Sequence, residues 1–338
     1  MSRYTAAHQW DALAGPGDAR PTAEQIIKDL GAKNTLASKI ILITGVSSGI
    51  GAATAAALAA TGATIVGAGR SIPKAKAALS AIANYPRLHL LQLDLASSAS
   101  IKKFASDFLQ QFHGLNILIN NAGGILAEHS ISEDGVERQC AMNYLGQFQL
   151  FGLLKDALLA SATAGFPSRV VNVSSTGHKR APLQDDLGGF FHVGKEEYDP
   201  MRAYCRAKTA SVYMAGEIER RYGARDLHAW SVHPGAILAS AFLDSSGFDQ
   251  ATVDQLLDLW PEKYFKSNEQ GAATQVWAAV GADVLQKDAL GRYLEDVSVA
   301  VPAGETPWPE VLGYAEHTYD EGKAARLWEL SEEKLAHV

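Results

Sequence analysis

A tyrosine and a lysine lie four residues apart in the segment Tyr204-Cys-Arg-Ala-Lys208. The surrounding sequence is typical of a helix, so this spacing places the phenol and the ammonium group on one face. A free tyrosine has a pKa of about 10, and a neighbouring ammonium ion lowers that pKa by favouring the phenolate. We therefore expect Tyr204 to act as a general acid and base near neutral pH.

A Y-x-x-x-K spacing is common by chance, so the prediction depends on other polar residues nearby. Ser174 and Ser175 end one predicted strand, and Asn120 and Asn121 end another. Asn143 lies in the predicted helix between these two strands. Successive side chains of a strand point to opposite faces, so only one of the two serines can face a common cleft.

A glycine-rich turn, Thr44-Gly-Val-Ser-Ser-Gly-Ile-Gly51, links the first predicted strand to a helix at 52–60. Such a turn lets backbone N–H groups approach a pyrophosphate at the helix N-terminus, where the helix dipole favours negative charge. No Lys-Ser or Lys-Thr follows, which excludes a phosphate-loop NTPase motif. Glycines that serve only a tight turn are the alternative. The expected contacts are Gly45, Ser47, Ser48, Gly49, Ile50 and Gly51.

The end of the second predicted strand decides between the two nicotinamide cofactors. An acidic residue there would accept a hydrogen bond from a ribose 2′-hydroxyl, but this chain has Gly69 followed by Arg70. Arg70 can bind a 2′-phosphate, with Lys74 in support. We therefore expect NADP(H) as the cofactor, with a solvated surface arginine as the alternative.

Asp94 and Leu95 follow the third predicted strand, close to the same expected pocket. The Asp94 carboxylate can accept a hydrogen bond from the adenine amino group. It can equally cap the N-terminus of the next helix.

Short apolar runs alternate with longer helix-like segments along the chain. This alternation predicts parallel βαβ units, and the nearly continuous apolar character indicates strands covered on both faces. We predict an α/β fold, a doubly wound Rossmann-type parallel sheet of about seven strands with helices on both faces. The runs are 40–44, 64–69, 88–93, 116–120, 169–174, 227–233 and 292–301.

The predicted organisation is an N-terminal extension, 1–38, before a single Rossmann-type oxidoreductase domain, 39–338. The extension contains one expected helix, 21–30, that follows the start signal of Pro21. The later segment 236–268 is rich in aromatic and aliphatic residues, which fits either ordinary core or a pocket lid. The domain includes two inserted substrate-side segments, 176–203 and 236–268, and a C-terminal helix at about 320–335.

Composition narrows the classes of partner. The 338 residues carry 30 Lys and Arg against 37 Asp and Glu, a net charge of −7. This balance argues against nucleic acid or an anionic membrane surface as the main partner. We expect no secretory signal, no integral membrane segment and a cytoplasmic protein, either a monomer or a homodimer. Two cysteines are too few for a disulfide framework or a cysteine-based zinc site, so we expect no metal.

The motifs T-G-x-x-x-G-I-G, N-N-A-G, N-V-S-S, Y-x-x-x-K and H-P-G occur in one order over about 36–300. With these motifs in this order, the sequence resembles the short-chain dehydrogenase/reductase family. The long interval from Ser175 to Tyr204, the YLED at 293–296 and the ending LWELSEEKL are similar to its retinol-dehydrogenase-like and WW-domain-oxidoreductase-like branch, especially the fungal members. No WW domain is readable in this chain.

The resemblance implies roles for individual residues. Asn143 would hold a water for proton replacement, and Ser175 is favoured over Ser174. Where the branch usually has a threonine, this chain has Ala239 followed by Ser240, so the hydrogen bond to the nicotinamide carboxamide is either absent or made by Ser240. The implied catalytic tetrad is Asn143, Ser175, Tyr204 and Lys208, and the implied cleft residues are Asn121, Ala122, Gly123, Pro234 and Gly235.

These residues predict an NADPH-dependent carbonyl reductase, or in reverse an alcohol dehydrogenase. The substrate would be an apolar small-molecule ketone, aldehyde or alcohol. Reduction of C=C or C=N on the same scaffold is one alternative. A non-enzymatic NADP(H)-binding sensor or scaffold is the other, although such a protein has no physical need for a Tyr–Lys pair beside a serine.

Overall fold

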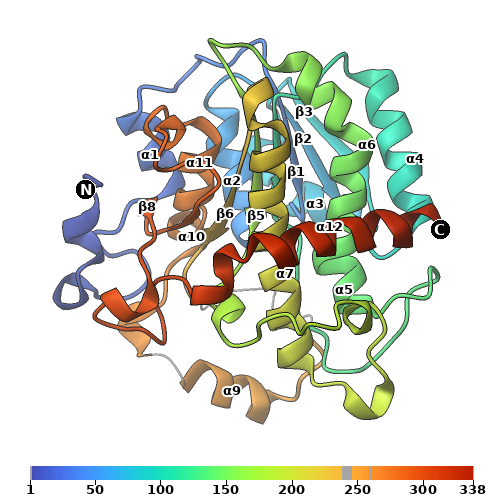
Figure 1. Ribbon diagram of the computed structural model, residues 1–338. Coiled ribbons are helices and arrows are strands. Elements are labelled where there is room, and N and C mark those ends of the chain that lie inside the picture. The colour runs from blue at the N-terminus through green and yellow to red at the C-terminus, as the bar shows by residue number, and fades with distance from the viewer. Residues whose placement is uncertain (1, 238–245, 259–260, 338) are drawn as a thin grey trace.

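In the computed structural model, which describes residues 2–237, 246–258 and 261–337, one eight-stranded sheet runs through the molecule (Figure 1). The strand order is β3-β2-β1-β4-β5-β6-β7-β8, and every neighbouring pair is parallel except β7 and β8. The order reverses beside β1, as in a doubly wound fold. The strands are β1 Ile40–Thr44, β2 Thr64–Gly69, β3 Leu88–Gln92, β4 Ile117–Asn120, β5 Ser168–Val173, β6 Leu227–His233, β7 Tyr293–Glu295 and β8 Ser298–Val299.

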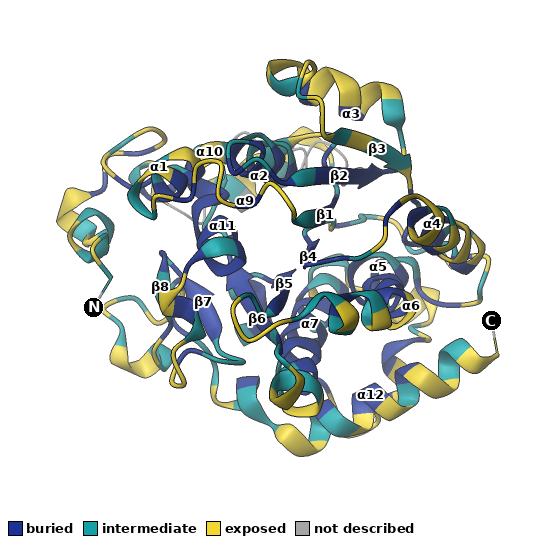
Figure 2. Cartoon of the chain, turned by 90° about the horizontal axis from the view of Figure 1, so that it is seen from above, coloured by how far each residue is buried: buried dark blue, intermediate teal, exposed yellow. Residues whose placement is uncertain are grey.

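Helices cover both faces of the sheet, as predicted (Figure 2). One face packs against α4, α6, α7 and α12, and the other against α1, α2 and α11, giving two separate apolar clusters. The helices are α1 Ala23–Asp29, α2 Gly49–Ala59, α3 Ile72–Ala78, α4 Ser98–Gln111, α5 Arg138–Cys140, α6 Gly146–Ser161, α7 Pro200–Tyr222, α9 Gln250–Asp258, α10 Asn268–Gly271, α11 Ala273–Val280 and α12 Glu321–Ala336.

The last predicted strand, 292–301, is two strands in the structure. Asp296 and Val297 have positive φ values of 51° and 57° and form a two-residue turn that reverses the chain from β7 into the antiparallel β8. Neither turn residue is a glycine or an asparagine, the types that most often mark such a turn. The sheet therefore has eight strands where about seven were expected.

Both chain ends pack on the sheet domain. Ile26 and Ile27 of α1 are buried in the cluster shared with α2 and α11. Leu327 and Trp328 of α12 are buried against α6 and α7 on the other face. The sheet core therefore includes part of the N-terminal extension as well as the C-terminal helix.

The predicted inserted segment 176–203 divides between core and pocket. Short 3-10 turns occupy much of it, and α7 begins within it at Pro200. Its apolar residues Leu183, Leu187, Phe190 and Phe191 are buried in the core cluster. These four residues support the core, whereas Thr176, Gly177, Arg180 and Met201 of the same segment line the pocket.

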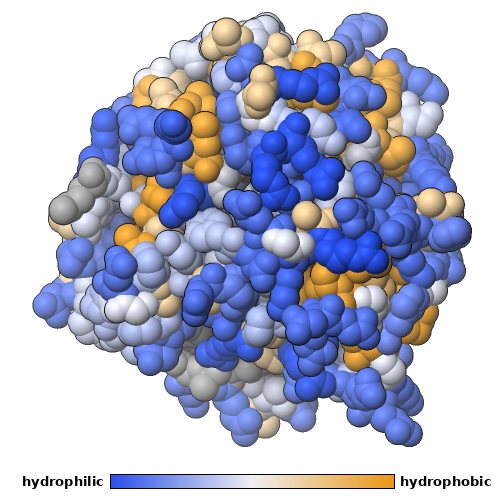
Figure 3. Space-filling view, viewed as in Figure 1, coloured by the Kyte–Doolittle hydropathy of each residue, from blue (hydrophilic) through white to orange (hydrophobic). Residues whose placement is uncertain are grey.

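The surface is largely polar. In Figure 3 hydrophilic side chains cover most of the visible face, and apolar residues form small separate groups. Within 2–237, 246–258 and 261–337, no helix has the length and apolarity that crossing a bilayer requires.

Candidate active site

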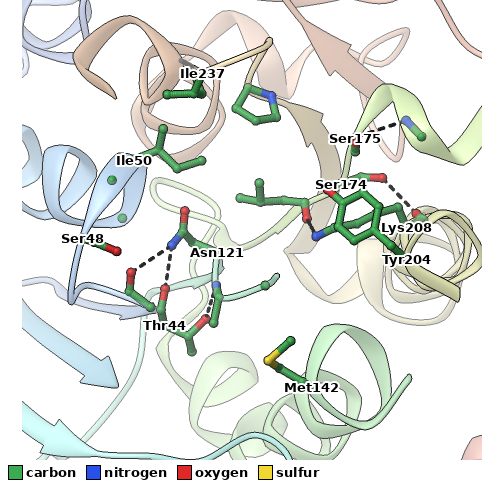
Figure 4. Close-up of a pocket in the computed structure, with 18 of the residues that line it drawn as sticks. Thr44, Ser48, Ile50, Asn121, Met142, Ser174, Ser175, Tyr204, Lys208 and Ile237 are labelled. Carbon is green, nitrogen blue, oxygen red and sulfur yellow. Dashed lines mark hydrogen bonds between the residues drawn. The ribbon is translucent and has the colours of Figure 1, made fainter. Parts of the chain in front are cut away.

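A pocket of about 760 Å³ lies at the carboxyl ends of the parallel strands (Figure 4). Its lining comes from the residues that follow β1, β2, β3, β4, β5 and β6, together with the first turns of α2 and α7. Ligands of doubly wound sheets bind at this edge. Among the predicted site residues, the lining contains Gly45, Ser47, Ser48, Gly49, Ile50, Gly51, Arg70, Lys74, Asp94, Leu95, Asn121, Ala122, Gly123, Ser175, Tyr204, Lys208, Pro234 and Gly235.

The glycine-rich turn is held by close backbone approach. Gly45 has φ +79°, and a Cβ there would lie 2.7 Å from the Cα of Ala122. A Cβ on Gly51 would collide with the carbonyl oxygen of Gly45 and the side-chain amide of Asn121. Asn121 Nδ2 donates to the carbonyl of Thr44 at 2.9 Å, which joins the ends of β1 and β4. These positions accept no larger side chain without a shift of the main chain.

Helix α2 starts at Gly49, three residues before the predicted start, so its first turn is part of the glycine-rich segment. Ser48 is the N-cap residue and is exposed on the pocket side. The eleven-residue helix directs its free N–H groups and the positive end of its dipole into the pocket. This cradle fits a pyrophosphate of a nicotinamide cofactor.

Arg70 and Lys74 lie at the same end of the pocket, and both side chains are exposed. Arg70 directly follows β2, and Lys74 is in the first turn of α3. At Gly69 a Cβ would lie 2.8 Å from Ser47 Oγ, so a larger residue there requires the serine hydroxyl to rotate away. Two cations therefore line this part of the wall, and one acid, Asp94, lies in the lining after the neighbouring strand β3.

Asp94 does not cap α4. The N-cap is Ser97, whose side chain accepts a hydrogen bond from the backbone of Ser100. One Asp94 carboxylate oxygen instead accepts from the backbone N–H of Ala96 at 2.9 Å. The carboxylate retains acceptor capacity on the pocket side.

The two serines after β5 take different directions. Ser174 Oγ is buried and donates to the carbonyl of Lys208 at 2.9 Å, which ties β5 to α7. Ser175 Oγ accepts from the backbone N–H of Gly177 at 3.0 Å and is hydrogen-bonded to the phenol of Tyr204. The geometry therefore favours Ser175 as the reactive partner.

Tyr204 and Lys208 share the face of α7 that faces the pocket (Figure 4). Lys208 Nζ lies 5.5 Å from the centre of the Tyr204 ring. This ammonium group is buried and donates to the carbonyl of Val173 at 2.8 Å. The helix thus brings both groups to one end of the pocket, next to Ser175.

The expected lowering of the Tyr204 pKa by Lys208 is wrong for the chain by itself. Burial raises the pKa of Tyr204, and the hydrogen bond from Ser175 lowers it by less. Burial also lowers the pKa of Lys208 to about 8. Both groups lose hydration in the same place, so their charged forms are disfavoured together. The phenol therefore keeps its proton at neutral pH.

Asn143 lies behind the pocket wall and is fully buried. It belongs to a π-helical turn, Ala141–Leu145, between α5 and α6. Its side chain accepts from the backbone N–H of Gly124 and donates to the carbonyl of the same residue, both at 2.9 Å. A Cβ on Gly123 would lie 3.0 Å from Asn143 Oδ1 and 3.1 Å from Lys208 Nζ. Asn143 and Lys208 therefore meet at Gly123.

Apart from the polar residues described above, the pocket lining is mainly apolar and irregular, and we call this part the substrate end. Arg180 supplies a charged group there among the described residues, and its side chain is exposed. Ser240, like Ala239, Phe242 and Trp260, lies outside the described residues. The side chains that form this wall are Ala236, Ile237, Leu257, Tyr264, Phe265, Met201 and Cys205.

Sequence reasoning missed several lining residues. Thr44 Oγ1 accepts from the backbone N–H of Ala122 at 3.0 Å, a contact that its place at the end of β1 could have suggested. His233 lines the pocket and accepts from the backbone N–H of Thr176 at 3.3 Å through Nδ1. Burial lowers the pKa of His233 to about 3, so it is neutral. Its place before Pro234 was the available signal.

Comparison with known proteins agrees with this geometry. The family model for short chain dehydrogenase matches residues 39–184. Short-chain dehydrogenase/reductase prx1 of Penicillium roqueforti is 43% identical over 326 residues, which cover 94% of this chain and 91% of that protein. Retinol dehydrogenase 13 of Homo sapiens is 33% identical over 304 residues, 88% of this chain and 84% of that protein.

The fold is shared with solved structures as well. The Pseudomonas aeruginosa RhlG/NADP active-site complex superposes with a TM-score of 0.62 over 78% of this chain and 96% of that chain, at 21% identity. The likeness shows a shared fold, and the sequence matches place the chain in an oxidoreductase family whose members bind a nicotinamide cofactor. The chain belongs to the short-chain dehydrogenase/reductase family, in its retinol-dehydrogenase-like branch.

Proposed function

We propose that this chain is an NADPH-dependent carbonyl reductase, or in reverse an alcohol dehydrogenase, acting on apolar small-molecule ketones, aldehydes or alcohols. One observation carries the proposal. The hydrogen-bonded pair Ser175 and Tyr204 and the buried ammonium of Lys208 meet at one end of a pocket whose other end is a glycine-rich phosphate cradle.

The residues divide the work of reduction. A bound nicotinamide cofactor supplies the hydride. Ser175 and Tyr204 donate hydrogen bonds to the carbonyl oxygen as negative charge develops on it. Tyr204 then transfers its phenolic proton to that oxygen, which completes the alcohol. The raised pKa of Tyr204 keeps this proton available at neutral pH.

Lys208 and Asn143 support the transfer. The Lys208 ammonium binds the nicotinamide ribose, next to Gly123. The amide of Asn143 keeps one donor and one acceptor beyond its two bonds to Gly124. This capacity lets it hold the water through which Tyr204 regains a proton.

Three observations support NADP(H) over NAD(H). Arg70 and Lys74 present two exposed cations at the ribose end, where a 2′-phosphate would lie. The chain has Gly69 at the position where an acid would accept a hydrogen bond from the ribose 2′-hydroxyl of NAD(H). A structural neighbour, RhlG, was solved as an NADP complex.

The apolar wall of Ile237, Leu257, Tyr264 and Phe265 supports a bulky apolar substrate. A cytoplasmic location and a monomeric or homodimeric state stay predictions of the sequence.

A ketone panel tests the proposed function. The purified chain is incubated with NADPH and with small ketones, bulky apolar ketones, an aldehyde, an α,β-unsaturated ketone and an imine. We expect loss of nicotinamide absorbance that is fastest with the bulky ketones, and an alcohol as product. Conversion of the α,β-unsaturated ketone to the saturated ketone would indicate C=C reduction. NADPH binding without any turnover would indicate a sensor.

A further inference from the structure

The N-terminal segment, residues 8–20, lies beside the wall of the substrate end, although more than 240 residues separate the two in sequence. In Figure 1 the blue N-terminal chain runs next to the orange segments that lead to α10. We infer that this N-terminal segment is a working part of the active site, and that Arg20 is the positioning residue that sets the Tyr264–Phe265 wall. The inference rests on the proposed function.

The Arg20 guanidinium is the main connection. Its side chain is only 1% exposed and forms an ion pair with Asp18 at 2.8 Å. It donates hydrogen bonds to three consecutive backbone carbonyls, at 3.3 Å to Lys263, 2.8 Å to Tyr264 and 2.6 Å to Phe265. Three carbonyls on one rigid planar group fix the path of this backbone. The side chains of Tyr264 and Phe265 extend from this backbone and line the pocket, so Arg20 positions two residues of the pocket wall.

A second connection fixes the other end of the same wall. Gln270 Nε2 donates to the carbonyl of Arg20 at 3.2 Å and to Asp18 Oδ1 at 3.0 Å, and its Oε1 accepts from the N–H of Gly17 at 2.9 Å. The same side chain completes the capping box with Ser267 that starts α10. The N-terminal segment thus reaches the first turn of a helix that packs on α2.

Apolar and charged contacts reinforce the connection. Leu13 and Trp10 share a small cluster with Tyr264 and Ala236, both of which line the pocket. His8 lies 3.6 Å from Asp296, which pairs with the buried Lys266 at 2.6 Å.

Lys266 in turn supports the nicotinamide side of the pocket. Its backbone N–H donates to the carbonyl of Ala236 at 2.8 Å. A Cβ on Gly235 would lie within 2.8 Å of the Lys266 side chain. Two independent routes therefore run from the N-terminal segment to the pocket wall.

The experiment compares Arg20→Ala with Arg3→Ala in the full chain. Arg3 lies in the same extension but is exposed and donates only to the carbonyl of Asp29 among the described contacts. Hydrogen exchange of the peptide covering 261–270 is measured in both variants, with NADPH affinity by fluorescence and KM and kcat for the best ketone of the panel. Arg20→Lys serves as the conservative variant, because one ammonium cannot span three carbonyls.

We expect Arg20→Ala to speed exchange of 261–270 at least tenfold, to raise the ketone KM about tenfold and to change NADPH affinity less than twofold. Arg20→Lys should be intermediate and Arg3→Ala unchanged. Unaltered exchange in Arg20→Ala, or an equal loss of NADPH and ketone affinity, would overturn the inference. If exchange rises but the unaltered chain reduces no carbonyl, the positioning role stands and the proposed function fails.

Discussion

The two ends of the pocket are built in different ways. At the cofactor end, main chain meets main chain, since Gly45 and Gly51 leave no room for a Cβ beside Ala122 and Asn121. At the substrate end, side chains from distant segments support an irregular wall, and Arg20 holds that wall through its carbonyls. The cofactor end is encoded in a short glycine-rich motif, and its close backbone contacts leave no room for larger side chains. The substrate end depends on contacts that no short stretch of sequence reveals.

The largest effect is expected where the two ends meet. Tyr204→Phe removes the proton donor and keeps the ring, so both ends should still bind their ligands. We expect turnover with NADPH and ketone to fall by about 10³-fold or more, with NADPH affinity changed less than twofold. The control is Tyr85→Phe, whose hydroxyl donates to the carbonyl of Ala63 away from the pocket. Near-normal turnover in Tyr204→Phe would identify a different acid.

Adding one methyl group to the glycine-rich turn should disrupt cofactor binding. In Gly51→Ala the new Cβ would collide with the carbonyl of Gly45 and the amide of Asn121, so the turn must open. We expect NADPH affinity to fall more than tenfold and thermal stability to drop by several degrees, of order 1–3 kcal/mol.

The matched control for Gly51→Ala is Gly152→Ala, a glycine in α6 with nothing within 4 Å of an added Cβ. Alanine there should be neutral or slightly stabilising, because it lowers the backbone entropy of the unfolded chain. Equal NADPH binding by Gly51→Ala and the unaltered chain would show that the turn is less rigid than its contacts indicate.

The same contrast explains what sequence could predict. The strands β1 to β6 and the glycine-rich turn follow from local patterns, namely apolar runs and glycine spacing, and the structure confirms the doubly wound sheet. The turn between β7 and β8 was missed because Val297, a β-branched residue that strongly disfavours positive φ, occupies the second turn position after Asp296. The bond from Arg20 to Tyr264 joins a side chain to a backbone carbonyl 244 residues away, and has no periodicity to detect.

The spacing of residues in the sequence also led to a wrong expectation for the pKa of Tyr204 beside Lys208. The spacing of Tyr204 and Lys208 correctly put both groups at the pocket, but it carries no information on burial. Burial decides their pKa values, raising that of the phenol and lowering that of the ammonium group to about 8. Desolvation of both groups is a property of the tertiary structure.

Removing one cation should reduce the preference of the cofactor end for NADPH over NADH. Arg70→Ala should weaken NADPH binding by about 1.5–3 kcal/mol, roughly ten- to a hundredfold, through loss of a charge-assisted contact to the 2′-phosphate. NADH, which lacks that phosphate, should be affected little. Fluorescence titration with both cofactors measures the difference, and Lys76→Ala, an exposed lysine of α3 outside the lining, controls for net charge. Equal affinity of the unaltered chain for both cofactors would contradict the assignment.

The smallest effect is expected behind the substrate end, at Glu295. One of its carboxylate oxygens accepts from the N–H of Gly313 at 2.7 Å. Burial, followed by the nearby charge of Asp296, raises the pKa of Glu295 from 4.5 to about 8, with smaller opposing effects from the Gly313 hydrogen bond, Lys179 and Lys266. The folded chain therefore keeps a proton that the unfolded chain releases above about 4.5. Stability linked to this proton is fully present below that pH and is lost as pH rises to 8.

Glu295→Gln keeps the acceptor for Gly313 and removes the titration. Relative to the unaltered chain, we expect the variant to gain at least ~3 °C in Tm between pH 5 and pH 8, since about 1 kcal/mol corresponds to a few degrees in a protein of this size. Melting curves at half-unit pH steps measure the difference, which cancels the titration of other groups. Glu316→Gln, at an exposed site, should run parallel to the unaltered chain. A parallel curve for Glu295→Gln as well would show that this carboxyl titrates alike in the folded and unfolded protein, so that burial does not raise its pKa.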